Sequence, residues 1–233
     1  MRQDAAFGLC GVLLFLPFIA SPDFYSAYAS FNKAHPFLMS FLKFSVLATA
    51  GEALGLRVRT GSYSQPGFGL LPRAACWGLF GLAIQAAFIV FSAGTPQVLA
   101  RLGWAGAPEA LASPGLSGMK VLASLSVSTA MNLVFAPILM VTHKVTDTHI
   151  TGNGGSCLCL IKPIPAGRIL RELDWDVMWG FVLKKTIPLF WIPAHTITFL
   201  LAPEWRALFA ALLGIVLGVL LAVASSMARE KAG

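Results

Sequence analysis

Six long apolar runs constrain the fold of this chain more than any other feature of its sequence. They lie at residues 7–20, 37–56, 74–93, 119–142, 186–201 and 205–227. A helix needs about 20 mostly apolar residues to cross a hydrocarbon core of about 30 Å. Only 12% of the residues are charged, whereas about 25% are charged in an average soluble domain. We therefore expect an all-α, polytopic membrane helical bundle with five to six transmembrane helices, since the first and fifth runs are short or interrupted by proline.

Lysine and arginine fall mainly on one side of this expected bundle. If the chain crosses the membrane six times, the loops and span ends on the side of the N-terminus carry most of the lysine and arginine residues: Arg2, Arg57, Arg59, Arg73, Lys144, Lys162, Arg168, Arg171, Lys184, Lys185, Arg229 and Lys231. The loops and span halves on the opposite side carry Lys33, Lys43, Arg101, Lys120 and Arg206. Loops rich in lysine and arginine stay in the cytoplasm, so we expect both termini to be cytoplasmic. The net charge of +7 also favours contact with anionic membrane lipids. No aromatic-basic platform accompanies the charge, so no nucleic-acid partner is expected.

Residues 1–23 are expected to form an extra N-terminal apolar helix. The opening MRQD carries little positive charge, and the possible cleavage site at residues 27–29 lies well beyond the apolar run. We therefore interpret the run as a retained helix and not as a signal peptide. Pro17 would kink it, which leaves both a spanning and an interfacial position open. Because no arginine- and serine-rich transit segment is present, we expect a bacterial-type inner (cytoplasmic) membrane.

Residues 24–229 form the main membrane bundle in this interpretation, and they contain one long connection. Residues 144–165 include TGNGGS and KPIP, which are turn and linker sequences, so we predict a cytoplasmic loop there. The following residues, 168–185, carry apolar side chains at every fourth position, namely Ile169, Leu173, Val177 and Phe181. This spacing predicts an amphipathic helix that lies at the cytoplasmic surface of the membrane.

Polar side chains recur at helical spacing on several of the expected spans. Such groups are costly in a bilayer unless they face protein or water, and in the fourth run they predict a face that is wet from end to end. The candidate pore- or solute-lining residues are Lys43, Glu52, Gln85, Ser124, Ser128, Asn132, His143, Trp191, His195 and Thr198. Lys43 and Glu52 are nine residues apart and so point to opposite sides of one helix. The alternative interpretation is that these groups only form hydrogen bonds between helices.

Prolines and glycines predict where the spans bend and where they pack closely. Pro188 and Pro193 each remove a backbone donor, so we expect the fifth run to be kinked or partly unwound. The freed carbonyl groups would then face His195, Thr198 or water. Small residues let two helix backbones approach closely, within one chain or in a homo-oligomer or a membrane-protein partner. The small residues concerned are Gly51, Gly55, Gly214 and Gly218.

Several of these residues also belong to recognisable motifs. The motif positions in the last two runs are Trp191, Pro193, His195, Thr198, Phe199, Pro203, Trp205 and Arg206. Earlier in the chain lie the segments Asn132-Leu-Val-Phe-Ala-Pro137, Ala34-His-Pro36 and Gly51-Glu52. Together these segments resemble the Mpv-seventeen/peroxisomal membrane protein family over residues 24–227. The family patterns are Trp-Pro-x-x-Gln-x-x-Asn-Phe, Asp-Gln-x-x-Phe-Ala-Pro, Ala-His-Pro and Gly-Asp. The chain departs from them in several places. Met131 replaces the aspartate, Pro193 stands one place late, His195 replaces the glutamine and Thr198 replaces the asparagine. The spacing from Pro203 to Arg206 is one residue shorter than in the family, and the glutamine that follows the family's Gly-Asp is missing.

The resemblance implies a channel-like membrane protein, and together with the polar residues it gives the expected function. We expect a weakly selective channel or pore for small solutes, with His143 and His195 as candidate gates because histidine titrates near neutral pH. The alternative is a non-transporting membrane organiser or assembly partner that binds lipid or protein. No nucleophile and base stand at a catalytic spacing, so we do not expect an enzyme. Cys157 and Cys159 form a CxC pair, which alone is a weak metal signal, and we expect no metal or other cofactor.

Overall fold

Helices make up every regular element in the part of the chain that the structure describes. The structure is a computed structural model, and it describes the backbone of residues 2–232 and the side chains of residues 2–220. The α-helices are α1 (Arg2–Ala20), α2 (Pro22–Ala34), α3 (Pro36–Thr60), α4 (Leu70–Arg101), α5 (Ala107–Ala112), α6 (Gly118–Gly152), α7 (Ala166–Glu172), α8 (Trp175–Val177), α9 (Ile192–Leu200) and α10 (Pro203–Ala232). A 3₁₀-helix, η1 (Cys157–Ile161), and a π-helix, η2 (Met178–Trp191), complete the described elements. The predicted all-α bundle is confirmed.

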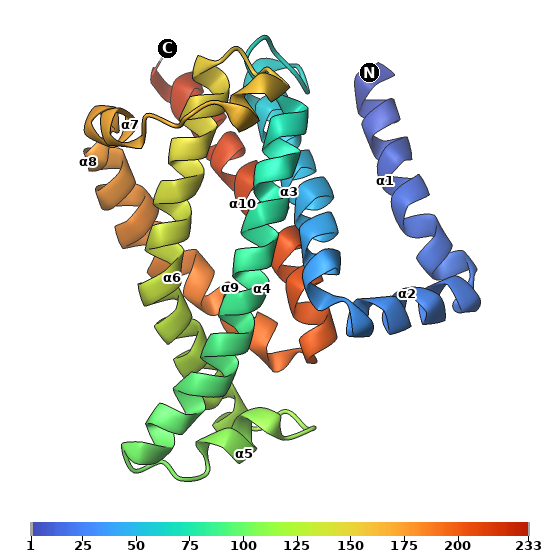
Figure 1. Cartoon of the computed structure of the whole chain (residues 1–233), viewed down its shortest axis with the longest axis vertical. Helices are drawn as coiled ribbons and strands as arrows, with labels where there is room; N and C mark the ends of the chain where they lie inside the picture. Colours follow the sequence, from blue (N-terminus) through green and yellow to red (C-terminus); the bar gives the residue numbers. More distant parts are fainter. Residues whose placement is uncertain (1, 233) are drawn as a thin grey trace.

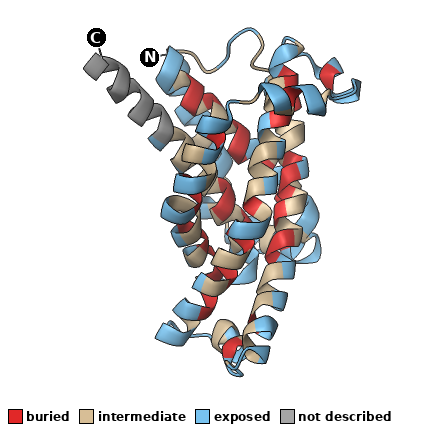
Figure 2. Cartoon of the chain, turned by 90° about the vertical axis from the view of Figure 1, so that its left-hand side faces the viewer, coloured by how far each residue is buried: buried red, intermediate tan, exposed pale blue. Residues whose placement is uncertain are grey.

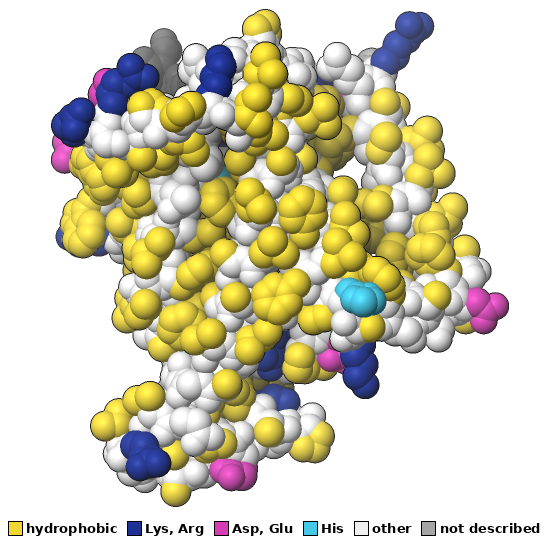
Figure 3. Space-filling view, in the orientation of Figure 1, with side chains coloured by type: hydrophobic (Ala, Val, Ile, Leu, Met, Phe, Trp, Pro, Cys, Tyr) yellow, Lys and Arg dark blue, Asp and Glu magenta, His cyan; other side chains and the backbone are white. Residues whose placement is uncertain are grey.

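Five of the described helices are long and apolar enough to cross a membrane, namely α1, α3, α4, α6 and α10. A further passage along the bundle is made by α8, η2 and α9, which follow one another without a break from Trp175 to Leu200. Hydrophobic side chains cover the middle of the visible face, whereas lysine and arginine gather toward its ends (Figure 3). In Figure 1, α1 begins and α10 finishes at the same end of the bundle.

Helix α1 stands apart from the other long helices (Figure 1), and none of its described residues is buried. Its first turn is held to the end of α3, because Asp4 forms an ion pair with Arg57 at 2.8 Å and Phe7 stacks on Tyr63 with ring centroids 4.6 Å apart. Its last turn joins α2, which Ser21 caps by accepting a hydrogen bond from the backbone N–H of Phe24. An apolar helix without buried residues is suited to contact with lipid.

The core of the bundle lies among α3, α4, α6, α9 and α10, whose buried residues face one another (Figure 2). Gly51 and Gly55 on α3 allow α10 to approach closely. A Cβ atom at Gly51 would lie 2.9 Å from the Cα of Ile215, and one at Gly55 would lie 3.5 Å from the carbonyl oxygen of Gly218. Three of the four predicted packing glycines therefore meet within the chain. Gly214 does not take part, since no atom lies within 4 Å of the position that its Cβ would occupy.

Two predicted boundaries differ from the structure. Helix α6 continues to Gly152, so the first part of the predicted loop at residues 144–165 is helical and the loop begins at Asn153. The predicted amphipathic helix at residues 168–185 is divided, because α7 ends at Glu172 and Asp174 caps α8 by accepting a hydrogen bond from the backbone N–H of Val177. Capping by a carboxylate competes with continuation of a helix at the same residue.

The fifth passage is distorted, as its prolines predict. Residues 178–191 form the π-helix η2, with Pro188 inside it, and α9 follows directly with Pro193 in its first turn. A proline cannot donate to the carbonyl group one turn earlier, and a π-helix shifts hydrogen bonds to the fifth residue along the chain. The shift rotates the side chains of η2 relative to a regular helix and directs Trp191 and Thr186 toward the interior of the bundle.

Candidate functional site

A cavity of about 590 Å³ lies between α3, α4, α6, η2 and α10. We call it the Arg73 cavity. It follows one face of α6 over several turns, from Asn132 through Leu139 and His143 to Thr151. This length of helix corresponds to roughly 28 Å at 1.5 Å per residue. The walls between its two ends are mainly apolar, with Phe44, Ile84, Met131, Phe135, Leu139 and Met178 among the lining residues.

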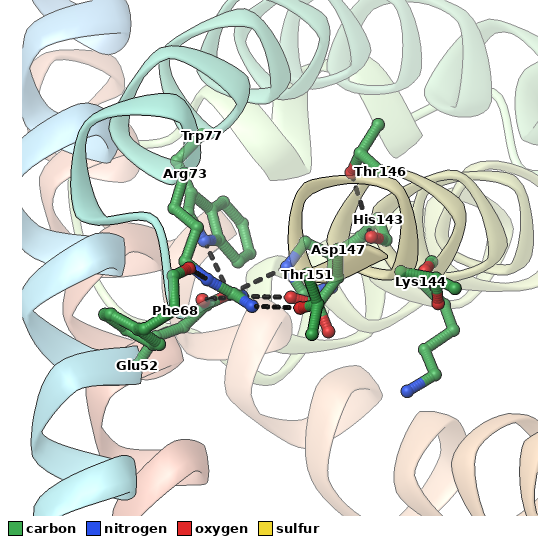
Figure 4. Close-up of polar contacts among 10 residues, drawn as sticks. Glu52, Phe68, Arg73, Trp77, His143, Lys144, Thr146, Asp147 and Thr151 are labelled. Carbon is green, nitrogen blue, oxygen red and sulfur yellow. Dashed lines mark hydrogen bonds and ion pairs between the residues drawn. The ribbon is translucent and has the colours of Figure 1, made fainter. Parts of the chain in front are cut away.

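One end of the Arg73 cavity carries a cluster of charged side chains from three helices (Figure 4). The Arg73 guanidinium on α4 contacts Glu52 on α3, with 2.5 Å between Nη1 and Oε2, and forms an ion pair with Asp147 on α6. Its Nε donates to the carbonyl oxygen of Phe68 at 2.5 Å, and Nη2 donates to the Thr151 hydroxyl at 3.4 Å. Arg73 therefore connects α3, α4 and α6 at this end of the bundle.

The second oxygen of Glu52 is also occupied. Trp77 Nε1 donates to Glu52 Oε1 at 2.8 Å, and His143 Nε2 lies 2.8 Å from the same oxygen. The Trp77 and His143 rings are 4.6 Å apart. The cluster holds two carboxylates, Glu52 and Asp147, and one guanidinium, Arg73. Glu52 thus faces the interior of the bundle. Its position only five residues before Arg57 would also have allowed its side chain to reach the lipid headgroups.

The other end of the Arg73 cavity is polar but uncharged. Asn132 on α6 and His195 on α9 form a hydrogen bond between the side-chain amide and Nδ1, with distances of 3.1 and 3.2 Å to the two amide atoms. Ser128 donates to the carbonyl oxygen of Ile192 at 2.7 Å. Trp191 stands one turn before His195, and its ring lies 5.2 Å from the imidazole. These contacts fix α9 against α6 near the middle of the bundle.

A second cavity, of about 610 Å³, lies on the α2 side of the bundle and is lined by Asn32, Lys33, Gln85, Glu204 and Ala207 among others. We call it the Gln85 cavity. Gln85 accepts a hydrogen bond from Ser40 at 3.0 Å. Lys43 lies behind the wall of this cavity, where Nζ donates to Asn32 at 2.6 Å, and Asn32 in turn donates to the carbonyl oxygen of Glu204 at 3.2 Å. Lys43 and Glu52 have separate partners, in agreement with their predicted opposite directions on α3.

The two cavities approach each other closely on two helices. On α4, Ile84 lines the Arg73 cavity and its neighbour Gln85 lines the Gln85 cavity. On α10, Ala210 lines the Arg73 cavity and Ala207 lines the Gln85 cavity. Residues 207 and 210 are separated by about 4.5 Å along a helix axis. The buried side chains of Phe44, Ile84, Phe88 and Phe199 pack together in the core next to these lining residues, and we call this set the septum. Phe88 and Phe199 meet edge to face at 5.6 Å.

The predicted lining residues divide into three groups. Glu52, Asn132, His143, Trp191 and His195 line the Arg73 cavity, and Gln85 lines the Gln85 cavity. Ser124, Ser128 and Thr198 have no exposed surface and line neither cavity. Lys43 is likewise buried in the wall. The face of α6 that was expected to be wet from end to end is dry between Ala123 and Ser128, because it packs on the core around Val127 and Phe199.

The remaining motif residues shape the helix ends and bends. Pro137 lies inside α6, and Pro203 begins α10. Arg206 donates to the carbonyl oxygen of Leu201 at 3.2 Å, and its guanidinium lies 5.3 Å from the Phe199 ring. Trp205 stacks on Tyr25 of α2 at 6.2 Å. The turn between α9 and α10 therefore holds Phe199 in the septum and joins it to α2.

Sequence reasoning missed three members of the charged cluster as site residues. Arg73 was counted only as a charge that sets the topology, and neither Trp77 nor Asp147 was among the candidate site residues. Arg73 and Asp147 lie just outside the apolar runs at residues 74–93 and 119–142, and Trp77 lies near the start of the first of these runs. Within the part of the chain whose side chains are described, no three His, Cys, Asp or Glu side chains come together to hold a metal ion.

Comparisons with protein-family models, with curated proteins and with solved structures found no match for this chain. Family membership therefore stays a prediction from the motifs. The function must be argued from the cavities, the septum and the charged cluster.

Proposed function

We propose that this protein is a weakly selective membrane channel for small solutes, and that the described conformation is its closed state. The observation that carries the proposal is the pair of cavities whose lining residues on α10, Ala210 and Ala207, are separated by about 4.5 Å along the helix axis, and we infer that the septum separates the two cavities. A membrane bundle without a transport path would be expected to pack its interior without voids of this size, since protein interiors are close-packed. Two cavities in line, with polar groups in each, are the arrangement expected of an occluded path.

The septum is suited to close such a path because its side chains are bulky, apolar and supported by one movable segment. Phe199 belongs to α9, which continues from the π-helix η2. π-Helical segments are energetically unfavourable and are often found at functional sites. A change of η2 toward α-helical hydrogen bonding would rotate α9 and carry Phe199 away from Phe88. Hydrophobic constrictions of this kind gate pores by excluding water.

The charged cluster would control entry at the other end of the Arg73 cavity. Glu52, Arg73 and Asp147 are paired with one another, while the exposed Arg59 and Lys144 also line the entrance. Lys144 points away from Arg73 (Figure 4). A permeating solute would therefore meet a mixed entrance with both signs of charge, which favours weak selectivity over selection of one ion.

The test is solute release from proteoliposomes, with a size series of neutral and charged dyes. Replacement of Phe199 by Ala shortens the septum on α9, and we expect it to raise the release of small dyes several-fold over the wild type. Leu189→Ala is the matched control, since Leu189 is 76% exposed on the neighbouring η2. Equal release from the Phe199→Ala protein, the control protein and empty liposomes, with folded protein in each case, would contradict the proposal.

The organiser alternative has lost part of its support. It would use the small residues of the last span, together with the interfacial helix, to contact lipid or another protein. Gly218 instead packs against Gly51 and Gly55 of the same chain. The exposed apolar surface of α1 can be explained by contact with membrane lipid alone and does not require a protein partner. We therefore prefer the channel proposal, which is also what the resemblance to the Mpv-seventeen/peroxisomal membrane protein family implies, and it includes no catalytic step.

A further inference from the structure

The uncharged end of the Arg73 cavity presents one donor and one acceptor without protein partners. Trp191 Nε1–H is enclosed and has no hydrogen-bond partner among the described residues. His195 uses Nδ1 for its contact with Asn132, and no described group bonds to its Nε2. Both side chains line the cavity, and they stand one helical turn apart. An enclosed N–H group without a partner is costly, and such a group in a native structure calls for an explanation.

The hydrogen bonds around Asn132 determine which role His195 Nε2 plays. The two amide hydrogens of Asn132 are used by the Ser128 carbonyl oxygen at 2.8 Å and the Ser128 hydroxyl oxygen at 3.2 Å. That hydroxyl can only accept, because its own hydrogen goes to the carbonyl oxygen of Ile192. Asn132 Nδ2 also lies 3.1 Å from His195 Nδ1, but with its two hydrogens directed at Ser128 we assign the proton to His195 Nδ1, which then donates to Asn132 Oδ1 at 3.2 Å. A neutral imidazole with its proton on Nδ1 has a bare acceptor at Nε2.

A hydroxyl group fits this pair, because it accepts through oxygen and donates through hydrogen. A charged group does not fit. Among the described side chains, no ionised group forms a hydrogen bond or ion pair with Trp191, His195 or Asn132, and burial of an unpaired charge is strongly unfavourable. The carboxylates and the guanidinium of the charged cluster lie at the far end of the cavity and are already paired.

The walls between the two ends determine the rest of the ligand. Asn132 and His143 are separated by about 16 Å along α6, and the side chains between them that line the cavity are apolar, including Phe135 and Leu139. Met178 faces the same space from η2. Methionine adapts its shape readily and is common in sites for apolar ligands. The cavity volume of about 590 Å³ lies in the usual range for small-molecule sites.

We propose that the Arg73 cavity binds an uncharged amphiphile with an apolar body and a terminal hydroxyl group, its hydroxyl held between Trp191 Nε1 and His195 Nε2. The hydroxyl oxygen accepts from the indole, and the hydroxyl hydrogen is donated to the imidazole. The apolar body then lies along Phe135, Leu139 and Met178. This site does not depend on the channel proposal, since binding requires only the described conformation.

The experiment uses 1-decanol that carries a diazirine in the middle of its chain, photolysed with the full-length protein in lipid nanodiscs and mapped by mass spectrometry. We expect labelling at Phe135, Leu139 or Met178. Trp191→Phe removes the donor and keeps a smaller aromatic ring, and it should reduce this labelling about five-fold, as expected for one lost hydrogen bond. Trp179→Phe is the matched control, because Trp179 is 64% exposed, and it should leave the labelling unchanged.

A second comparison uses only the wild-type protein, so that a folding defect of the variant cannot obscure the result. The methyl ether of the same probe cannot donate to His195, and the matching decanoate is charged at pH 8; both should label the cavity at least about five-fold less than the alcohol. Equal labelling by the alcohol and the ether, or labelling confined to outward residues such as Leu189 and Ile197, would overturn the proposal. Neither result depends on solute release, so the site and the channel proposal can fail separately.

Discussion

Removal of the Arg73 guanidinium should destabilise the protein more than any other single charge change in the Arg73 cavity. In Arg73→Met, the Glu52 and Asp147 carboxylates would face each other without a cation between them. Loss of one partner of a buried ion pair costs about 3–5 kcal/mol. We expect the lower end, about 3 kcal/mol, because the three side chains keep 10%, 19% and 25% of their surface exposed. The expected loss includes the repulsion between the two remaining carboxylates.

The assay is reversible unfolding in mixed micelles, followed by circular dichroism. Arg59→Met is the matched control, since Arg59 lines the same cavity but is exposed, and it should change the free energy of unfolding by less than about 0.5 kcal/mol. The triple variant Glu52→Gln, Arg73→Met, Asp147→Asn removes all three charges, and it should be more stable than Arg73→Met alone, because a neutral set avoids the uncompensated charges. A triple variant that is less stable than Arg73→Met would refute the reasoning.

Further predictions concern packing, thiol chemistry and the polar end of the cavity. Gly51→Ala should lower the free energy of unfolding by about 1–3 kcal/mol, because its Cβ would meet the backbone of Ile215. Gly214→Ala should be neutral or stabilising in the same unfolding assay. Equal effects of the two variants would contradict the close packing of α3 on α10 at Gly51. Burial raises the pKa of the Cys159 thiol, so its reactive thiolate form is scarce up to a higher pH. Iodoacetamide at pH 8 should therefore modify the exposed Cys157 well before Cys159, as followed by mass spectrometry. Faster modification of Cys159 than of Cys157 would refute the burial of Cys159. Asn132→Leu leaves the Ser128 and His195 groups without their partner and should cost about 2–4 kcal/mol, while Ser126→Ala, whose hydroxyl only bonds within α6, should change stability by less than about 0.5 kcal/mol.

The helices could be predicted from the sequence because apolar runs of spanning length have few alternatives to helix in a bilayer. The proline-rich fifth run was also predicted to be irregular, and its irregularity takes the form of η2. The end of α6 could not be predicted in the same way. The TGNGGS and KPIP signals lie after Gly152, and nothing in residues 144–152 shows that Asp147 and Thr151 hold the helix to Arg73.

The candidate site was harder to predict than the fold, for two physical reasons. First, a polar residue on an inward face has the same sequence pattern whether it meets water or another helix. Ser128 and Asn132 are one turn apart on the same face, yet only Asn132 reaches a cavity. Second, the charged cluster joins three helices that are distant in sequence, and Arg73 looked like one more positive charge at a membrane boundary.

The septum is tested most directly by the accessibility of single cysteines from each side of the membrane. In a variant with Cys10, Cys76, Cys157 and Cys159 replaced by serine, cysteines are placed at Ala136 in the Arg73 cavity, at Ala207 in the Gln85 cavity and at Val127 in the packed core. A small membrane-impermeant thiol reagent is applied to sealed proteoliposomes of known orientation. We predict that Ala136→Cys reacts only from the side of the chain termini, Ala207→Cys only from the opposite side, and Val127→Cys from neither. Reaction of Ala136→Cys and Ala207→Cys from the same side, or of neither from any side, would contradict two cavities that open to opposite sides and are separated by a septum.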